Sequence, residues 1–144
     1  MTNKTARAKW SGDLDSGQGS FSYGHEPGVS ETYTKESRFE EGKGVGPEDL
    51  IAAAHAGCYS MALSHLLNEE GEKPQGVATT ATVALGEDDD GFAISASELK
   101  TEVSCPGLTQ EKLDRLAAGA AQECPVSKAL AGVEISVEAV LAGS

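Results

Sequence analysis

Residues 47–67 form the most apolar helix that the sequence can make, and this segment begins with signals typical of a helix N-terminus. Pro47 suits the first helical position, and the acidic residues directly after it face the positive end of the helix dipole. The interior is apolar nearly all round and rich in Ala and Gly, which predicts a buried helix that other backbones approach closely. Gly71 is typical of a helix C-terminus. We therefore expect one long central helix over 46–71.

The segments on either side of this helix are predicted to be strands and shorter helices. Residues 33–39 are expected to form a strand because they contain Thr and aromatic residues. The final segment alternates apolar and polar residues, as a half-buried strand does. This order predicts an α+β fold with antiparallel sheets, in a chain whose length suits a single domain over 1–144. The expected parts are N-terminal strands (1–42), the central helix (46–71), a hairpin (77–104), helices (109–131) and a final strand (133–141).

Charge and cysteine content limit the partners and the compartment. The net charge of −12 disfavours nucleic acid and anionic membranes, which carry charge of the same sign. Three cysteines are too few, and odd in number, for a disulfide framework, so a reducing compartment, the cytoplasm, is expected. The first ten residues lack the apolar region of a secretory signal. The apolar segment contains histidines and serines, which favours a core helix over a membrane span.

Cys58 lies in the middle of the predicted helix, where a thiol should be inert. Burial in apolar surroundings raises the pKa of a thiol. Cys58 is also about 16 Å from the helix start at 1.5 Å per residue, so the dipole cannot activate it. A reactive Cys58 needs a fixed cation, and arginine keeps its charge where lysine does not. Arg38, in the expected strand, is the best candidate.

Glu48 is a natural partner for Arg38, because a carboxylate can bind guanidinium through two hydrogen bonds. However, Glu48 and Cys58 are ten residues apart on one helix, which is about 15 Å along its axis. They are not expected to share one site within one chain. If Arg38 contacts both, the Cys58 thiolate comes from a second chain. The spacing therefore favours a dimer with composite sites.

Cys124 precedes Pro125, which places it at the cap of the next helix. We expect it to be less shielded there and near a positive helix end, as suits a resolving thiol that attacks a sulfenic acid.

Other interpretations stay open. A buried Cys58 is more often packing than catalysis. His55, one turn before Cys58, could ligate a metal or act as the base of a thiol hydrolase. A core histidine with satisfied hydrogen bonds is the stronger interpretation. Neither a metal nor a cofactor is expected. A non-enzymatic module that binds apolar ligands along the helix is a third class.

Two segments together resemble a known family. Residues 46–64, which contain His-Ala-Gly-Cys, and residues 124–130, which begin Cys-Pro-Val-Ser, are similar to the osmotically inducible protein C and organic hydroperoxide resistance (OsmC/Ohr) family. The residues of both motifs are more similar to the OsmC branch of the family. The resemblance extends from Trp10 to Leu141, nearly the whole chain.

The resemblance implies a thiol peroxidase that reduces organic hydroperoxides. By position, Cys58 is the peroxidatic thiol and Cys124 the resolving thiol, and Arg38 and Glu48 match the activating pair. The implied fold is an intertwined homodimer, with antiparallel sheets wrapped around long central helices and sites at the interface. The family pattern does not include Cys105, which is expected to be structural.

The implied reaction passes through a Cys58 sulfenic acid and a Cys58–Cys124 disulfide. A dithiol reductant, for which a lipoylated protein is a candidate, then reopens that disulfide. Apolar walls at Leu50, Ile51 and Met61 would favour alkyl or lipid hydroperoxides.

Overall fold

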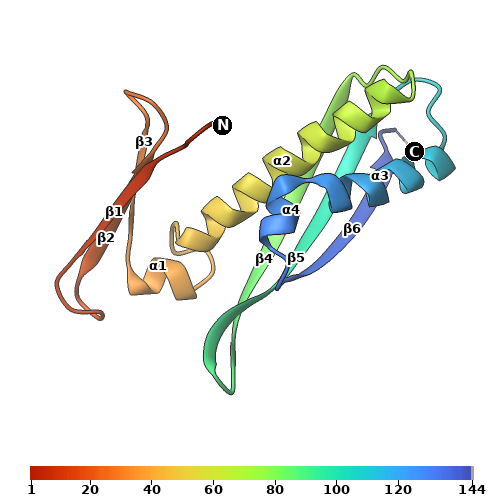
Figure 1. Cartoon of the computed structure of the whole chain (residues 1–144). Coiled ribbons are helices and arrows are strands. Elements are labelled where there is room, and N and C mark those ends of the chain that lie inside the picture. The colour runs from red at the N-terminus through yellow and green to blue at the C-terminus, as the bar shows by residue number, and fades with distance from the viewer. Residues whose placement is uncertain (144) are drawn as a thin grey trace. The chain divides into compact units, whose positions relative to one another are not determined.

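The computed structural model describes residues 1–143 of the chain (Figure 1). The chain divides into two compact units, Met1–Asp49 and Leu50–Ser144, and each is described by itself. The expectation that 1–144 forms a single domain stays a prediction.

The first unit contains a three-stranded antiparallel sheet in the order β1-β2-β3, with β1 at Ala6–Ser11, β2 at Gln18–Tyr23 and β3 at Val29–Tyr33. Its aromatic cluster joins all three strands: the Tyr33 ring centroid lies 5.6 Å from that of Trp10 and 5.1 Å from that of Phe21. A Cβ at Gly19 would lie only 2.5 Å from the Tyr33 ring. Glycine at this position therefore permits the ring to pack on the sheet.

A short helix, α1 (Lys35–Phe39), follows β3. The prediction of a strand over 33–39 is therefore wrong after Tyr33, and Arg38 lies on a helix. The reason is local: Thr34 and Ser37 form a capping box, in which Ser37 N–H donates to Thr34 Oγ1 (3.1 Å) and Thr34 N–H donates to Ser37 Oγ (2.8 Å). These reciprocal bonds satisfy free backbone donors and outweigh the weak strand preference of the segment.

The predicted central helix is confirmed as α2 (Pro47–Glu69). At its start the Asp49 carboxylate accepts a 2.7 Å hydrogen bond from the Gly46 N–H. Just beyond its end Gly71 takes a positive φ of 81°, which suits glycine at a helix C-terminus.

The prediction that α2 is buried all round is wrong for the described chain. Its buried residues recur every fourth position and so lie on one side: His55, Tyr59, Leu63 and Leu67. Met61 on another side is 74% exposed, and Ala53, Ala54 and Gly57 are exposed too. We call these four residues the exposed α2 face. By length and composition α2 could cross a membrane, but its Leu63 side packs in the core of the second unit.

The sheet of the second unit is mixed rather than antiparallel throughout. The predicted hairpin is confirmed as β4 (Gly76–Asp88) paired with β5 (Gly91–Ser104). The last strand, β6 (Glu134–Leu141), pairs with β5 in parallel, which corrects the expectation of antiparallel sheets. Two helices, α3 (Gln110–Glu123) and α4 (Pro125–Ala129), connect β5 to β6. Such a crossover is the connection that a parallel pair requires.

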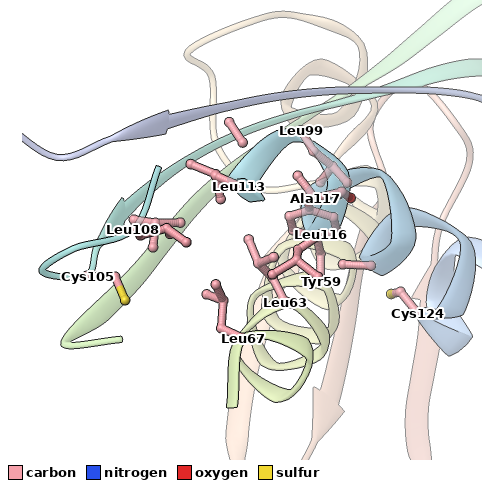
Figure 2. Packing of buried hydrophobic residues seen from close by; sticks show 13 residues of the cluster. Tyr59, Leu63, Leu67, Leu99, Cys105, Leu108, Leu113, Leu116, Ala117 and Cys124 are labelled. Carbon is pink, nitrogen blue, oxygen red and sulfur yellow. Dashed lines mark hydrogen bonds between the residues drawn. The ribbon is translucent and has the colours of Figure 1, made fainter. Parts of the chain in front are cut away.

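Between α2, α3 and this sheet lies the hydrophobic core of the second unit (Figure 2). The Tyr59 hydroxyl joins the two helices by donating to the Ala117 carbonyl oxygen at 3.0 Å. Cys124 and Cys105 lie on opposite sides of this core in Figure 2. Its fully buried large side chains include Tyr59, Leu63, Leu67, Leu99, Leu113 and Val103.

Replacing Leu63 with alanine should lower the free energy of unfolding by about 3 kcal/mol, because Leu63 is fully buried and the change leaves a cavity. Leu14→Ala is the matched control, since Leu14 is 60% exposed and should cost well under 1 kcal/mol. Urea unfolding followed by circular dichroism measures both. Equal losses from the two substitutions would contradict the core described here.

Candidate active site

Cys58 and Cys124 come together in the second unit. Cys58 projects from the middle of α2 and packs against the core cluster that contains Cys124. Cys124 is the N-cap residue of α4, with Pro125 at the first helical position, as predicted. The prediction that Cys124 is less shielded is wrong: it is fully buried, whereas Cys58 is half-buried. Both thiols are free.

The two thiols have opposite pKa shifts. Burial raises the pKa of the Cys58 thiol, and the hydrogen bond that it donates to Cys124 raises it further. Burial also acts to raise the pKa of Cys124, but hydrogen bonds from Cys58, from Ser127 and from the Val126 N–H outweigh it and lower that pKa. Within this unit, then, the proton of the pair favours Cys58. None of the groups that act on Cys58 there is a cation.

Arg38 and Glu48 come together in the first unit, as predicted. Arg38 Nε and Nη2 both donate to Glu48 Oε1, at 3.0 and 2.8 Å, and Nε lies 3.4 Å from Oε2. Gly46 permits this approach, because a Cβ there would lie 3.1 Å from the Arg38 Cα. The Arg38 side chain remains 38% exposed and that of Glu48 only 12%. The carboxylate therefore fixes a guanidinium that still has free donors at the surface.

The structure thus holds the predicted site residues as two separate pairs. The predicted contact of Arg38 with Cys58 would join one unit to the other and stays a prediction. Glu48 and Cys58 are both on the continuous helix α2, ten residues apart, which is about 15 Å along the axis. The helix therefore has the ten-residue spacing that the sequence analysis assumed, and the site shared between chains stays a prediction.

His55 is a core histidine with both ring nitrogens occupied. It is fully buried, with Nδ1 at 2.7 Å from Ser97 Oγ and Nε2 at 2.8 Å from Ser127 Oγ. Burial lowers its pKa, which favours the neutral ring. Sequence reasoning favoured a satisfied core histidine, which is confirmed, but did not find its serine partners. The only signal was a polar residue in an apolar helix, together with the serine of the Cys-Pro-Val-Ser segment.

The remaining residues of interest lie around these pairs. Cys105 is buried in the core cluster, with its sulfur 4.0 Å from Glu72 Oε2, which fits the structural role expected for it. Met61 is exposed and lines a surface hollow together with Gly57 and Val77. Leu50 and Ile51 are half-buried. Their role as walls of a peroxide pocket stays a prediction.

Comparison with known proteins places the chain in a family. The model of the family described as OsmC-like protein matches residues 40–138. The chain is 45% identical over 130 residues to Peroxiredoxin OsmC of Escherichia coli (strain K12), which covers 89% of this chain and 90% of that protein. It is 33% identical over 97 residues to organic hydroperoxide resistance protein OhrB of Bacillus subtilis (strain 168), which covers 66% of this chain and 69% of that protein.

The folded chain is similar to solved structures of the same group. It matches the crystal structure of OhrB of Bacillus subtilis with a TM-score of 0.69 and 27% identity, over 94% of this chain and 97% of that one. The sequence match and the fold agree with the motifs around Cys58 and Cys124. The chain therefore belongs to the OsmC-like protein family.

Proposed function

We propose that this protein reduces organic hydroperoxides to alcohols, with Cys58 as the peroxidatic thiol and Cys124 as the resolving thiol. The observation that carries the proposal is the packing of Cys58 against the buried cluster that contains Cys124, where each thiol acts on the pKa of the other. A cysteine-based peroxidase is also what the relatives named peroxiredoxin and organic hydroperoxide resistance protein support. The half-buried Cys58 is the thiol that a substrate can reach, since Cys124 is fully buried.

The proposed reaction has three steps. The Cys58 thiolate attacks one peroxide oxygen, the O–O bond breaks, and the alkoxide leaves and takes up a proton to become the alcohol. Cys58 is then a sulfenic acid, two electrons more oxidised. Cys124 sulfur attacks Cys58 sulfur, the S–O bond breaks, and hydroxide leaves as water with the proton that Cys124 gives up. A dithiol reductant returns both thiols by exchange and is itself oxidised to a disulfide.

Activation of Cys58 is assigned to Arg38 of a second copy of the chain. Within its own unit Cys58 has a raised pKa, so it needs a positive charge from elsewhere to ionise at neutral pH. Arg38 suits this role because Glu48 holds it in a fixed orientation while part of it stays exposed. The exposed α2 face supplies an apolar surface, three of its four residues small, for a homodimer, and a Cβ at Gly57 would meet nothing within 4 Å.

The other functions considered from the sequence fit the site less well. A thiol hydrolase needs His55 as the base for Cys58, but both ring nitrogens of His55 already face serine hydroxyls. An apolar-ligand-binding module gives no reason for two thiols in contact. We propose the cytoplasm as the location, since three free thiols suit a reducing compartment. A lipoylated protein is the candidate for the dithiol reductant.

Cumene hydroperoxide should remove two of the three free thiols of each chain. Thiol titration before and after the peroxide measures the loss, and peptide mass spectrometry without reductant should find Cys58 joined to Cys124. Cys124→Ser should prevent the disulfide and leave Cys58 as a sulfenic acid that dimedone traps. Retention of all three thiols, or a disulfide that includes Cys105, would overturn the proposed function.

A further inference from the structure

A buried row of polar groups runs from the sheet, through α2, to Cys124. Ser97 on β5, His55 on α2 and Ser127 on α4 are all nearly or fully buried, with exposures of 1%, 0% and 6%. The imidazole bridges the two hydroxyls, at 2.7 Å from Ser97 and 2.8 Å from Ser127. No step of the proposed reaction uses these three residues. Buried polar groups in an apolar core are costly unless fully paired, so this arrangement calls for an explanation.

Ser127 connects the imidazole to the thiol. It lies three residues after Cys124, in the first turn of the helix that Cys124 caps, and both residues are buried. The N–H and the hydroxyl of Ser127 both act to lower the pKa of the Cys124 thiol. The Ser127 Oγ is therefore the group between the His55 ring and Cys124. The titratable groups that act on Cys124 from the neighbouring helix α2 are Cys58 and Tyr59, and the Tyr59 hydroxyl already donates to Ala117.

The state of Cys124 and the tautomer of His55 depend on each other through Ser127. A neutral imidazole has one donor nitrogen and one acceptor nitrogen, and a hydroxyl has one proton to donate. If Nε2 carries the proton, it donates to Ser127 Oγ, and the Ser127 proton is free to bond to a Cys124 thiolate. If Nδ1 carries the proton, Ser127 donates to Nε2 and can only accept, which suits a Cys124 thiol. In both cases the Ser97 hydroxyl pairs with Nδ1: it donates to Nδ1 in the first case and accepts from it in the second.

We propose that His55 and Ser127 are positioning residues for Cys124: the Nε2–H tautomer of neutral His55 turns the Ser127 hydroxyl toward Cys124 and stabilises its thiolate. The inference rests on the proposed function only in naming Cys124 as the resolving thiol. This arrangement explains how Cys124, although fully buried, can be a thiolate both when the disulfide closes and when it is reduced.

A stabilised Cys124 thiolate would speed two steps of the proposed reaction. When the disulfide closes, a Cys124 thiolate is the nucleophile that attacks the Cys58 sulfenic acid. When the disulfide is reduced, a thiolate of the dithiol attacks the more accessible Cys58 sulfur, the S–S bond breaks, and Cys124 leaves with the electron pair. A leaving thiol of lower pKa leaves faster. The second thiol of the reductant then displaces Cys58, which restores both protein thiols and leaves the reductant as a disulfide.

The test titrates Cys124 as the only thiol, in a Cys58→Ser, Cys105→Ser chain, by the ultraviolet absorbance of the thiolate against pH. Ser127→Ala should raise the titration midpoint by about one pH unit, since it removes a hydrogen bond to a charged group. His55→Leu should also raise the midpoint, whereas His55→Gln retains an N–H donor and should raise it less. Ser60→Ala is the matched control: Ser60 is on the same helix and bonds to Thr79 at 2.7 Å, so the midpoint should not move.

An unchanged midpoint in Ser127→Ala, or in a folded His55→Leu chain, would overturn the inference. A merely structural role would lower the melting temperature without moving the midpoint. If His55→Leu does not fold, nitrogen NMR of the His55 ring decides, in the Cys58→Ser, Cys105→Ser chain that retains His55. At pH values above the Cys124 titration midpoint we expect the Nε2–H tautomer, and an Nδ1–H tautomer at those pH values would refute the proposal. No peroxide is used, so failure here leaves the disulfide experiment unaffected, and failure of that experiment leaves this titration valid.

Discussion

Cys58→Ser is expected to lower the rate of organic hydroperoxide reduction at least about a thousandfold, because it removes the nucleophile that receives the peroxide oxygen. A serine hydroxyl is not ionised at neutral pH and therefore needs a base. His55, one turn away, is held by two serine hydroxyls. The rate of cumene hydroperoxide consumption with a dithiol reductant measures the effect.

Cys105→Ser is the matched control for this prediction. Cys105 is buried in the same core cluster, at 8% exposure, but on the opposite side of it from Cys124 (Figure 2). The control should keep nearly full activity, with at most a small loss of stability. Activity retained in Cys58→Ser, or lost in a folded Cys105→Ser chain, would assign the chemistry to a different thiol.

Local signals in the sequence predicted most elements but not their pairing. Helix α2 was predictable because its start and end are both marked, by Pro47 and by Gly71. Helix α1 was missed because a five-residue helix has no periodicity, and only the Thr34–Ser37 capping box indicates it. The direction of β6 was missed because alternation identifies a strand but not its partner, and the α3–α4 connection decides the pairing.

The site residues divide in the same way, into features that local sequence predicts and contacts that depend on distant residues. The pairing of Arg38 with Glu48 follows from charge and short separation, and the cap position of Cys124 follows from Pro125. The burial of Cys124 depends on how α2 and α3 pack, which no local pattern records. His55 meets serines 42 and 72 residues away, so its role as a bridge was outside the reach of single-sequence reasoning.

A mixed dimer of two impaired chains is expected to recover activity if the site is shared. Arg38→Ala should slow peroxide reduction at neutral pH at least about tenfold, because each pKa unit added to Cys58 removes a factor of ten in thiolate. Arg115→Ala is the control: Arg115 pairs with Glu70 at 3.1 Å on the surface and should be dispensable. In a dimer of one Arg38→Ala chain and one Cys58→Ser chain, the first supplies Cys58 and the second Arg38.

Such a heterodimer, isolated with two different affinity tags, contains one intact composite site out of two, so about half of the unsubstituted activity should return. Both parent homodimers lack every intact site and should stay near their low rates. If Arg38 instead acted on Cys58 of its own chain, each site of the heterodimer would lack either the cation or the thiol, and no activity would return. The result thus decides between a site shared between two chains and a site within one chain. The spacing on α2 favours the shared site, because Glu48, which holds Arg38, lies ten residues from Cys58, about 15 Å along the helix axis.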